Sequence, residues 1–373
     1  MKKQIWIPIL IIAIVIVGLV ILLPKSKKQV DKEPIKIGAI LPLSGKDIEW
    51  GEKPQKGIEL ALEEVNKNKK LIEVVYEDSE SSPEKAVSAA HKLININKVQ
   101  ILMCQLSDIC SVLAPFAQEN NILLFGFSNA PDLTNAGDYI FNLRGDSIYA
   151  GEALGRFAGD KYKTVAILYL NNPTVKGLYE GFKEAFENKG GEVLLAESHN
   201  KDDSDFRTSL TKIKEKNPEV LLLASRYKNE IDLIKQAKEL GLNQPVICNL
   251  GTDTKSFIDG LKDLAEGIIY PTATVSYDTQ NSKLQTALDK YQEKYDEPMP
   301  IWAAESYDSI KLVASFIEEN KNISQSSEIK KMLVEANGFP GLAGEITFDE
   351  TRTVVKDYYL FTIKNGQFVP YEE

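Results

Sequence analysis

The sequence predicts an α/β protein with two doubly wound, parallel-sheet lobes, preceded by one transmembrane helix. From residue 35 onward, short apolar runs alternate with segments of helical periodicity, which is typical of βαβ units and parallel sheets. This alternation restarts near residue 164, so two series of the same kind follow one another. Before both series stands an uninterrupted apolar run, Ile5 to Leu23.

The N-terminal run is long enough to cross a membrane. It holds no charged residue, and a helix of its length spans about 30 Å of hydrocarbon. A Lys-rich segment with no small-x-small cleavage pattern follows Pro24, which favours an uncleaved anchor over the alternative of a cleaved signal peptide. The first cysteine is Cys104, so a lipoprotein-type anchor is excluded. We expect residues 1–34 to form a membrane anchor and tether.

The first series begins with the apolar strand Ile35–Leu41, which Pro42 ends. Ile58, Leu62 and Val65 then recur at helical spacing within the expected helix Pro54–Asn66. The next elements in order are strand Leu71–Glu77, helix Glu84–Ile94, strand Val99–Cys104, helix Ser111–Asn120, strand Ile122–Phe125, the segment Tyr139–Asn142 and helix Ser147–Ala158.

The second series repeats the alternation. Its elements are strand Thr164–Tyr169, helix Gly177–Asn188, strand Val193–Ser198, helix Phe206–Lys216, strand Val220–Ala224, helix Glu230–Leu240 and strands Pro245–Cys248 and Gly267–Tyr270. Gly241 stands where a C-terminal glycine is expected after the helix Glu230–Leu240.

A different order follows Tyr270. Three helices come first and strands come last, namely helices Ser282–Tyr295, Ala303–Glu319 and Glu328–Ala336 and strands near Glu345–Phe348, Asp357–Ile363 and Gln367–Val369. This order predicts that the chain crosses back between the lobes. We expect residues 35–148 plus 275–350 in the first lobe and 149–274 plus 351–373 in the second.

Composition excludes several classes of function. With 44 Lys and Arg against 54 Asp and Glu, the net charge is −10, which makes the chain a poor nucleic-acid binder. Two His and three Cys argue against an imidazole-rich metal centre and a disulfide-rich scaffold, and we expect neither a metal nor a cofactor. Cys104 and Cys110 form either a disulfide or a pair of buried free thiols, and Cys248 would be left unpaired.

Catalytic motifs are also missing from the sequence. No G-x-G-x-x-G follows a strand, and neither a phosphate-binding lysine loop nor H-E-x-x-H occurs. The segment Gly126–Ala130 looks faintly like a nucleophile elbow, but it lacks the final glycine, and Pro131 follows it. We therefore expect a protein that is not an enzyme.

Polar loops follow the predicted strands, at the edge of an open α/β sheet where ligands bind. Their hydroxyls, amides and aromatic groups suit a small polar ligand, although each loop alone can equally be an ordinary solvated turn. The loops are Pro42–Gly45 with Trp50 and Gly51, Gln105–Asp108, Phe127–Asn129 including Ser128, Asn171–Thr174, Ser225–Tyr227, and Asn249–Asp253 including Gly251.

The opening of the globular part resembles a known family. The stretch Ile35–Gly45, followed by Trp50-Gly51 and Gly57–Ala61, is similar to the start of the leucine/isoleucine/valine-binding type I periplasmic binding proteins. Supporting matches are Asp78 with Pro83–Ala86, Ala114–Asn120, Ala130–Thr134 and Ala303–Asp308. The resemblance implies two lobes joined by a three-strand hinge, an extracytoplasmic globular part and an ABC permease as partner.

The resemblance also implies ligand contacts. Trp50 falls at the aromatic position of the first loop, and Ser107 or Asp108 at the hydroxyl position that holds a ligand carboxylate. Phe127 and Asn129 fall where a backbone group and a Thr side chain help bind the α-carboxylate and α-amine. Thr174 replaces one usual Tyr, and Arg226 or Tyr227 replaces another.

Two substitutions change the expected ligand. Leu250 occupies the position of the acid that pairs with an α-ammonium, and Asp108 and Asp253 are the candidates to replace that acid. Arg226 adds a planar fork suited to a carboxylate or phosphate. We therefore expect an anionic or amide-like ligand, or an amino acid held in another pose, rather than an ordinary branched-chain amino acid. A ligand sensor that signals through a partner protein is the alternative function.

Overall fold

The computed structural model describes residues 33–45, 47–273, 281–320 and 323–372. Chain contacts divide the protein into two units, Met1–Pro34 and Ile35–Glu373. The predicted membrane segment Ile5–Leu23 lies outside the described residues. In the part of the chain that is described, no helix combines the length and the apolar character needed to cross a membrane.

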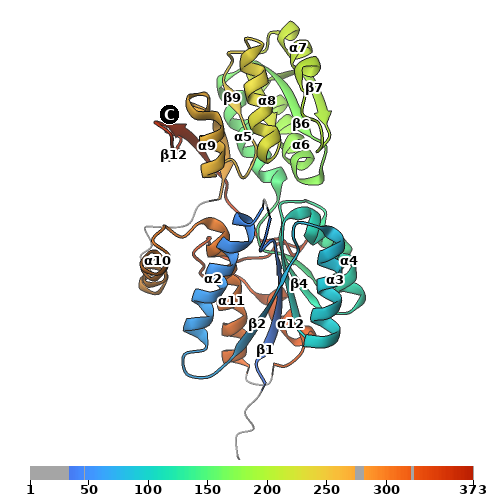
Figure 1. Cartoon of the computed structure of the whole chain (residues 1–373), viewed down its shortest axis with the longest axis vertical. Coiled ribbons are helices and arrows are strands. Elements are labelled where there is room, and N and C mark those ends of the chain that lie inside the picture. Colours follow the sequence, from blue (N-terminus) through green and yellow to red (C-terminus); the bar gives the residue numbers. More distant parts are fainter. Residues whose placement is uncertain (1–32, 46, 274–280, 321–322, 373) are drawn as a thin grey trace, which may run out of the picture. The chain divides into compact units, whose positions relative to one another are not determined.

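The first sheet is parallel throughout and has the strand order β2-β1-β3-β4-β5; Figure 1 labels β1, β2 and β4. Its strands are β1 Ile35–Leu41, β2 Ile72–Asp78, β3 Ile101–Gln105, β4 Leu123–Phe127 and β5 Ile140–Asn142. The central strands are almost completely buried, which explains why they read as continuous apolar runs in the sequence.

Helices cover both faces of this sheet. Ile37 and Ala39 of β1 point to a core shared with α2 Glu49–Val65, α10 Ser282–Tyr295, α11 Ile301–Glu319 and α12 Ser326–Glu335. Ile40 points to the opposite core, with α3 Pro83–Lys92, the π-turn Leu93–Asn97 and α4 Ser107–Glu119. This alternation along β1 is what a doubly wound sheet requires.

The second sheet is mixed, with the strand order β12-β11-β10-β9-β8-β6-β7. Strands β6 Thr164–Leu170, β7 Glu192–His199, β8 Val220–Ala224, β9 Val246–Ile247 and β10 Ile269–Thr272 are parallel. Strands β11 Tyr359–Lys364 and β12 Gln367–Pro370 extend it in antiparallel fashion. The second sheet is therefore not purely parallel, because the returning end of the chain pairs with β10.

The second sheet is also covered on both faces. Helices α5 Ser147–Lys161 and α6 Pro173–Asn188 pack in one core, and α7 Arg207–Lys216, α8 Tyr227–Glu239 and α9 Lys255–Leu261 pack in the other. Helices α10 to α12 follow β10 in the chain but belong to the core of the first sheet. The chain thus crosses back between the two sheets, as the order of elements after Tyr270 predicts.

The connections between the two sheets comprise residues 143–146, 273–281 and the stretch after Val354 that leads to β11. Most of the middle connection lies outside the described residues. The three-strand hinge and the lobe boundaries at residues 148, 274 and 350 therefore stay predictions.

Several predicted elements differ from the structure. The strand near Glu345–Phe348 is wrong, because this stretch forms only single bridges, Phe339 with Ile346 and Phe348 with Val354. Gly338 and Gly344 lie at φ +73° and +95°, so the chain turns before a ladder can grow. Helix α9 and a 3₁₀ turn, Lys262–Ala265, were not anticipated.

Several helices also begin earlier than their apolar periodicity indicates, among them α2, which begins at Glu49 instead of Pro54. Helix α4 begins at Ser107, α6 at Pro173 and α8 at Tyr227. For α6 the reason is local, since the Asn172 side chain accepts a hydrogen bond from the Val175 N–H and Pro173 stands at the first helical position. These earlier starts move Ser107 and Thr174 from predicted loops into first helical turns.

Candidate functional site

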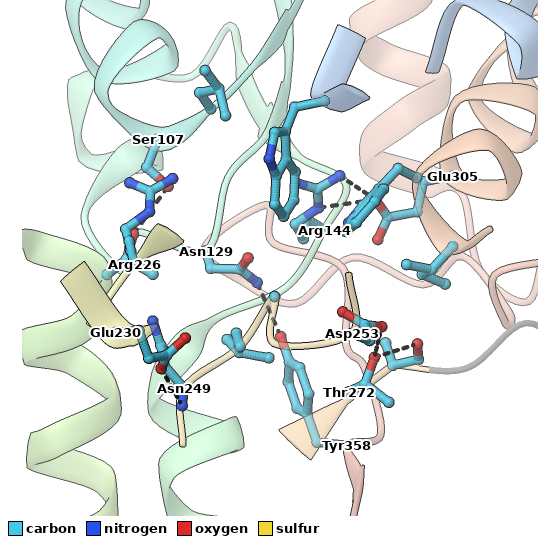
Figure 2. A pocket seen from close by; sticks show the side chains of 18 residues that line it. Ser107, Asn129, Arg144, Arg226, Glu230, Asn249, Asp253, Thr272, Glu305 and Tyr358 are labelled. Atoms are coloured by element: carbon cyan, nitrogen blue, oxygen red, sulfur yellow. Dashed lines mark hydrogen bonds and ion pairs between the residues drawn. The ribbon is translucent and has the colours of Figure 1, made fainter. Parts of the chain in front are cut away.

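A cavity of about 90 Å³ lies where elements of the two sheets meet (Figure 2). Most of its walls come from loops and helix ends that follow strands, as expected for an open α/β sheet. The lining residues are Trp50, Leu106, Ser107, Asn129, Arg144, Thr174, Arg226, Glu230, Asn249, Leu250, Gly251, Asp253, Thr272, Ala273, Ile301, Trp302, Glu305 and Tyr358.

Ser107 and Thr174 join the two walls. Ser107 is the first residue of α4, and Thr174 is the second residue of α6. The Thr174 hydroxyl donates to Ser107 Oγ across 2.9 Å, and both residues are buried. The N–H groups of a first helical turn lack partners within the helix and favour negative charge. Two helix N-termini therefore meet at one side of the cavity.

The loop that leads to Ser107 is constrained by a disulfide. Cys104 at the end of β3 is bonded to Cys110 in α4, which resolves the two alternatives that the sequence leaves open. Between them, Leu106 adopts φ +75°, a conformation that a residue with a branched side chain rarely takes. Cys248 is free, as expected, and it is buried.

Aromatic rings form an apolar wall. The rings of Trp50 and Trp302 lie 4.2 Å apart between centroids, tilted by 44°. Gly251 faces this wall from the other sheet at φ +82°, and a Cβ built on it would lie 3.1 Å from Trp50 Cη2. Glycine therefore allows the backbone after β9 to approach the indole ring closely.

Arg226 stands just before α8, and about a fifth of its side chain is exposed. Its Nη1 lies 3.9 Å from Asp108 Oδ1. Asp108 does not line the small cavity; within the described residues it lines a neighbouring cavity of about 700 Å³, to which Arg226 and Trp50 also belong. Arg226 thus lies where the small cavity meets the larger one.

A buried ion pair that the sequence analysis did not identify forms another wall. Arg144 donates from Nε and Nη2 to Glu305 Oε2, at 2.9 and 2.8 Å. Its Nη1 donates to the Phe127 carbonyl at 3.2 Å. Arg144 precedes α5 and Glu305 belongs to α11, so no short sequence motif could reveal the pair.

Glu230 and Asn249 form a polar corner beside Arg226 (Figure 2). Glu230 Oε1 accepts hydrogen bonds from the backbone N–H groups of Ser225 and Asn249, at 3.4 and 3.3 Å. Burial raises the pKa of Glu230 to about 8, against the smaller effects of these bonds and of Arg226. Glu230 is therefore mainly protonated at neutral pH. The sequence analysis did not single it out, because it lies within a helical pattern.

Asp253 and Tyr358 complete the site. Asp253 Oδ2 accepts a hydrogen bond from the Thr272 hydroxyl at 3.3 Å, and burial raises the pKa of this carboxyl. The Asn129 amide donates to Tyr358 Oη at 3.3 Å and to the Gly145 carbonyl at 3.4 Å. Figure 2 shows Asp253 and Thr272 on the side of the cavity away from Arg226 and Ser107.

The predicted contact residues divide into two groups. Seven of them line the small cavity, namely Trp50, Ser107, Asn129, Thr174, Arg226, Leu250 and Gly251. Phe127 and Ser128 are buried and do not line it within the described part of the chain; the Ser128 hydroxyl accepts from the Ala130 N–H. The structure does not describe the side chain of Tyr227. All roles in ligand binding stay predictions.

Comparison with known proteins places this geometry in a family. Residues 34–367 match the sequence model described as periplasmic binding protein. The leucine-, isoleucine-, valine-, threonine- and alanine-binding protein of Pseudomonas aeruginosa is 24% identical over 352 residues, covering 91% of this chain and 90% of that protein. The Leu/Ile/Val-binding protein BraC3 of Rhizobium johnstonii is 23% identical, covering 91% and 94%.

Solved structures of binding proteins have a similar fold. The substrate-binding protein LivJ of a branched-chain amino acid transporter from Streptococcus pneumoniae, in complex with isoleucine, shares 27% identity at a TM-score of 0.80, covering 90% of this chain and 98% of that chain. The leucine-binding protein LivK from Thermotoga maritima shares 24% identity at a TM-score of 0.82, covering 91% and 98%. With its two sheets and the cavity between them, the chain belongs to the periplasmic binding protein family.

Proposed function

We propose that this protein is the extracytoplasmic solute-binding component of an ABC importer. Residues 5–23 anchor it to the membrane, and the two lobes, with the predicted boundaries, close on a small polar ligand with an anionic group. The protein passes this ligand to a permease and catalyses no reaction itself. Its similarity to LivJ, a transporter substrate-binding protein, supports this function.

The observation that carries the proposal is the position of Arg226 in the cavity wall. Its guanidinium group suits a carboxylate, and the hydroxyls of Ser107 and Thr174 stand in the same cavity. Glu230 adds little negative charge there at pH 7, because its pKa is about 8. The N-termini of α4 and α6 add to the positive potential.

The apolar wall of the cavity favours a ligand that also has an apolar part. Trp50, Trp302 and Leu250 line the cavity together with Ile301. A ligand with an apolar or flat body can pack there while its anionic group faces Arg226. The relatives whose names state Leu/Ile/Val binding support an amino-acid-like size for this ligand.

Isothermal titration of the full-length protein tests the proposal, with amino acids, amides, monocarboxylates and dicarboxylates as probes. We expect a carboxylate-bearing probe to bind, and Arg226→Met to weaken binding about 10- to 100-fold, since a hydrogen bond to a charged group contributes about 1.5–3 kcal/mol. Arg156→Met is the matched control, because Arg156 pairs with Glu152 on the exposed side of α5. Leucine binding that survives Arg226→Met would contradict the role of Arg226.

Anchoring and delivery need separate tests. We expect the intact chain to sediment with membranes, and a variant in which a cleavable signal peptide replaces residues 1–31 to appear in the soluble extracytoplasmic fraction. Uptake of the identified ligand by cells should need both this chain and the permease. Uptake that continues unchanged without this chain would contradict its role in import.

A further inference from the structure

The polar corner of Glu230 and Asn249 has unused hydrogen-bonding capacity at the cavity. Glu230 lies in the first turn of α8, and Asn249 follows β9. Both line the cavity, with 3% and 1% of their surface exposed. Figure 2 shows them on the same side of the cavity as Arg226.

The orientation of the Asn249 amide follows from its partner. The Ser225 carbonyl can only accept a hydrogen bond, so the group that bonds to it at 3.0 Å must be the Asn249 Nδ2. The other end of the amide, Oδ1, is therefore an acceptor. It is buried and has no hydrogen-bond partner among the described residues. Such an atom costs free energy until a donor reaches it.

Glu230 has a similar surplus. Its Oε1 receives two backbone N–H groups at 3.4 and 3.3 Å, and once the carboxyl is ionised its oxygens can accept further hydrogen bonds. The corner thus offers acceptor atoms to a group that enters the cavity next to Arg226.

We propose that Glu230 and Asn249 bind a hydrogen-donating group of the ligand, an ammonium or an amide NH₂, next to the anionic group held by Arg226. The ligand is then a compact molecule that carries both groups, as an amino acid or the monoamide of a short dicarboxylic acid does. This inference rests on the proposed function. It also places the partner of an ammonium on α8, rather than at Asp108 or Asp253.

The charged groups around Glu230 support a proton-linked form of this recognition. Arg226 at the same helix end and Cys248, just after β9, interact electrostatically with Glu230. Arg144, Asp253 and Glu305 line the same cavity, and Lys228 and Asp108 line the neighbouring one together with Glu230. An arriving ammonium favours the ionised form of Glu230. Its binding should therefore release a proton from the protonated carboxyl at pH 7, whereas binding of a neutral amide should not.

Matched probes test the inference on the full-length protein by isothermal titration. One series is leucine, 4-methylpentanoate and 3-methylbutylamine, a second is phenylalanine, 3-phenylpropanoate and 2-phenylethylamine, and a third is glutaramate with pentanoate. In the series that binds, we expect loss of the donor group to weaken binding at least tenfold. Equal binding of the carboxylate without its donor group overturns the inference and leaves the proposed function standing. Failure of every probe contradicts both.

Variants then assign the effect to this corner. We expect Asn249→Leu to weaken binding of the donor-bearing probe at least tenfold and to leave the weaker carboxylate-only binding unchanged, which also shows that the variant is folded. Glu230→Gln, which keeps the size of the side chain, should abolish proton release when an amino acid binds. Gln236→Leu is the matched control, because its buried amide on the same helix bonds to Phe206 and Ser204 instead. Variants that behave like this control would overturn the inference.

Discussion

The hydroxyl of Thr174 donates to Ser107 Oγ across 2.9 Å, joining the first turn of α6 to the first residue of α4. Because α4 packs on the first sheet and α6 on the second, this bond connects the two halves of the fold at the cavity. The ion pair of Arg226 with Asp108 also joins the two halves, and a Cβ built on Gly251 would lie 3.1 Å from Trp50 Cη2. The cavity walls that come from the two sheets are therefore in contact with each other in this structure.

We expect Thr174→Val to weaken ligand binding about 2- to 10-fold. The substitution keeps the shape of the side chain and removes a hydrogen bond, which contributes about 0.5–1.5 kcal/mol. Titration of the ligand into both proteins measures the change. Thr211→Val is the control, since the Thr211 hydroxyl bonds to its own helix at Arg207 and to no other described residue. Equal affinities for the two variants would show that the bond does not favour the ligand-binding arrangement.

Gly251→Ala should weaken ligand binding in addition to lowering the stability of the fold. Alanine at φ +82° costs about 1–2 kcal/mol, and its Cβ would lie 3.1 Å from Trp50 Cη2. Gly241→Ala is closely matched, because Gly241 has φ +76° but its nearest heavy atom is Lys214 Nζ at 3.8 Å. Both variants should lower the unfolding temperature, and only Gly251→Ala should reduce affinity. A reduced affinity in both variants would point to backbone strain as the common cause.

Removal of the Cys104–Cys110 disulfide should loosen the loop that holds Ser107. We expect the double variant Cys104→Ala, Cys110→Ala to lose about 2 kcal/mol of unfolding free energy, as closing a loop this short predicts, and to bind ligand more weakly. Urea unfolding and titration measure the two effects. Cys248→Ala is the control, since Cys248 is buried and free. Unchanged affinity with reduced stability would limit the disulfide to a structural role.

The apolar strands were predictable because parallel strands are buried on both faces. Strand Val220–Ala224 and helix Ser282–Tyr295 have the predicted bounds, and the return of the chain to the first core after β10 follows from the order of elements. The loops after the strands supply much of the cavity wall, because the carboxyl ends of parallel strands lie at one edge of a sheet.

The rest of the site depends on contacts distant in the sequence. Arg144 and Glu305 are 161 residues apart, and although Glu305 lies in the family-like stretch Ala303–Asp308, nothing in the sequence links it to Arg144. Helix α4 begins at Ser107, directly after Leu106 with its positive φ of +75°. Hydrophobic periodicity does not predict such a backbone conformation. Glu230 was read only as the start of a helix, although this helix begins three residues earlier and Glu230 faces the cavity. Side-chain burial, rather than residue type, distinguishes these positions.

The buried Glu230 should make stability depend on pH. Its pKa is about 8 in the folded protein and about 4.5 when exposed, so between these values the folded state binds more protons than the unfolded state. The free energy of unfolding should therefore fall as pH rises from 4.5 to 8, by up to about 1.4 kcal/mol per pH unit from this group. Unfolding of Glu230→Gln across this range should show a shallower slope. Asp308, whose pKa of about 7 is also raised by burial, supplies a remaining slope of the same sign.

Replacing one member of the Arg144–Glu305 pair should cost more unfolding free energy than replacing both members together. Glu305→Leu or Arg144→Met alone leaves the other member as an uncompensated buried charge, and loss of one member of a buried pair costs about 3–5 kcal/mol. In the double variant Arg144→Met, Glu305→Leu, no uncompensated charge remains, so we expect it to be more stable than Arg144→Met alone. It should stay below the wild type, because the Phe127 carbonyl loses its Arg144 donor. Thermal unfolding of the three variants measures the cycle. Additive losses in the double variant would show that the two side chains do not interact in solution.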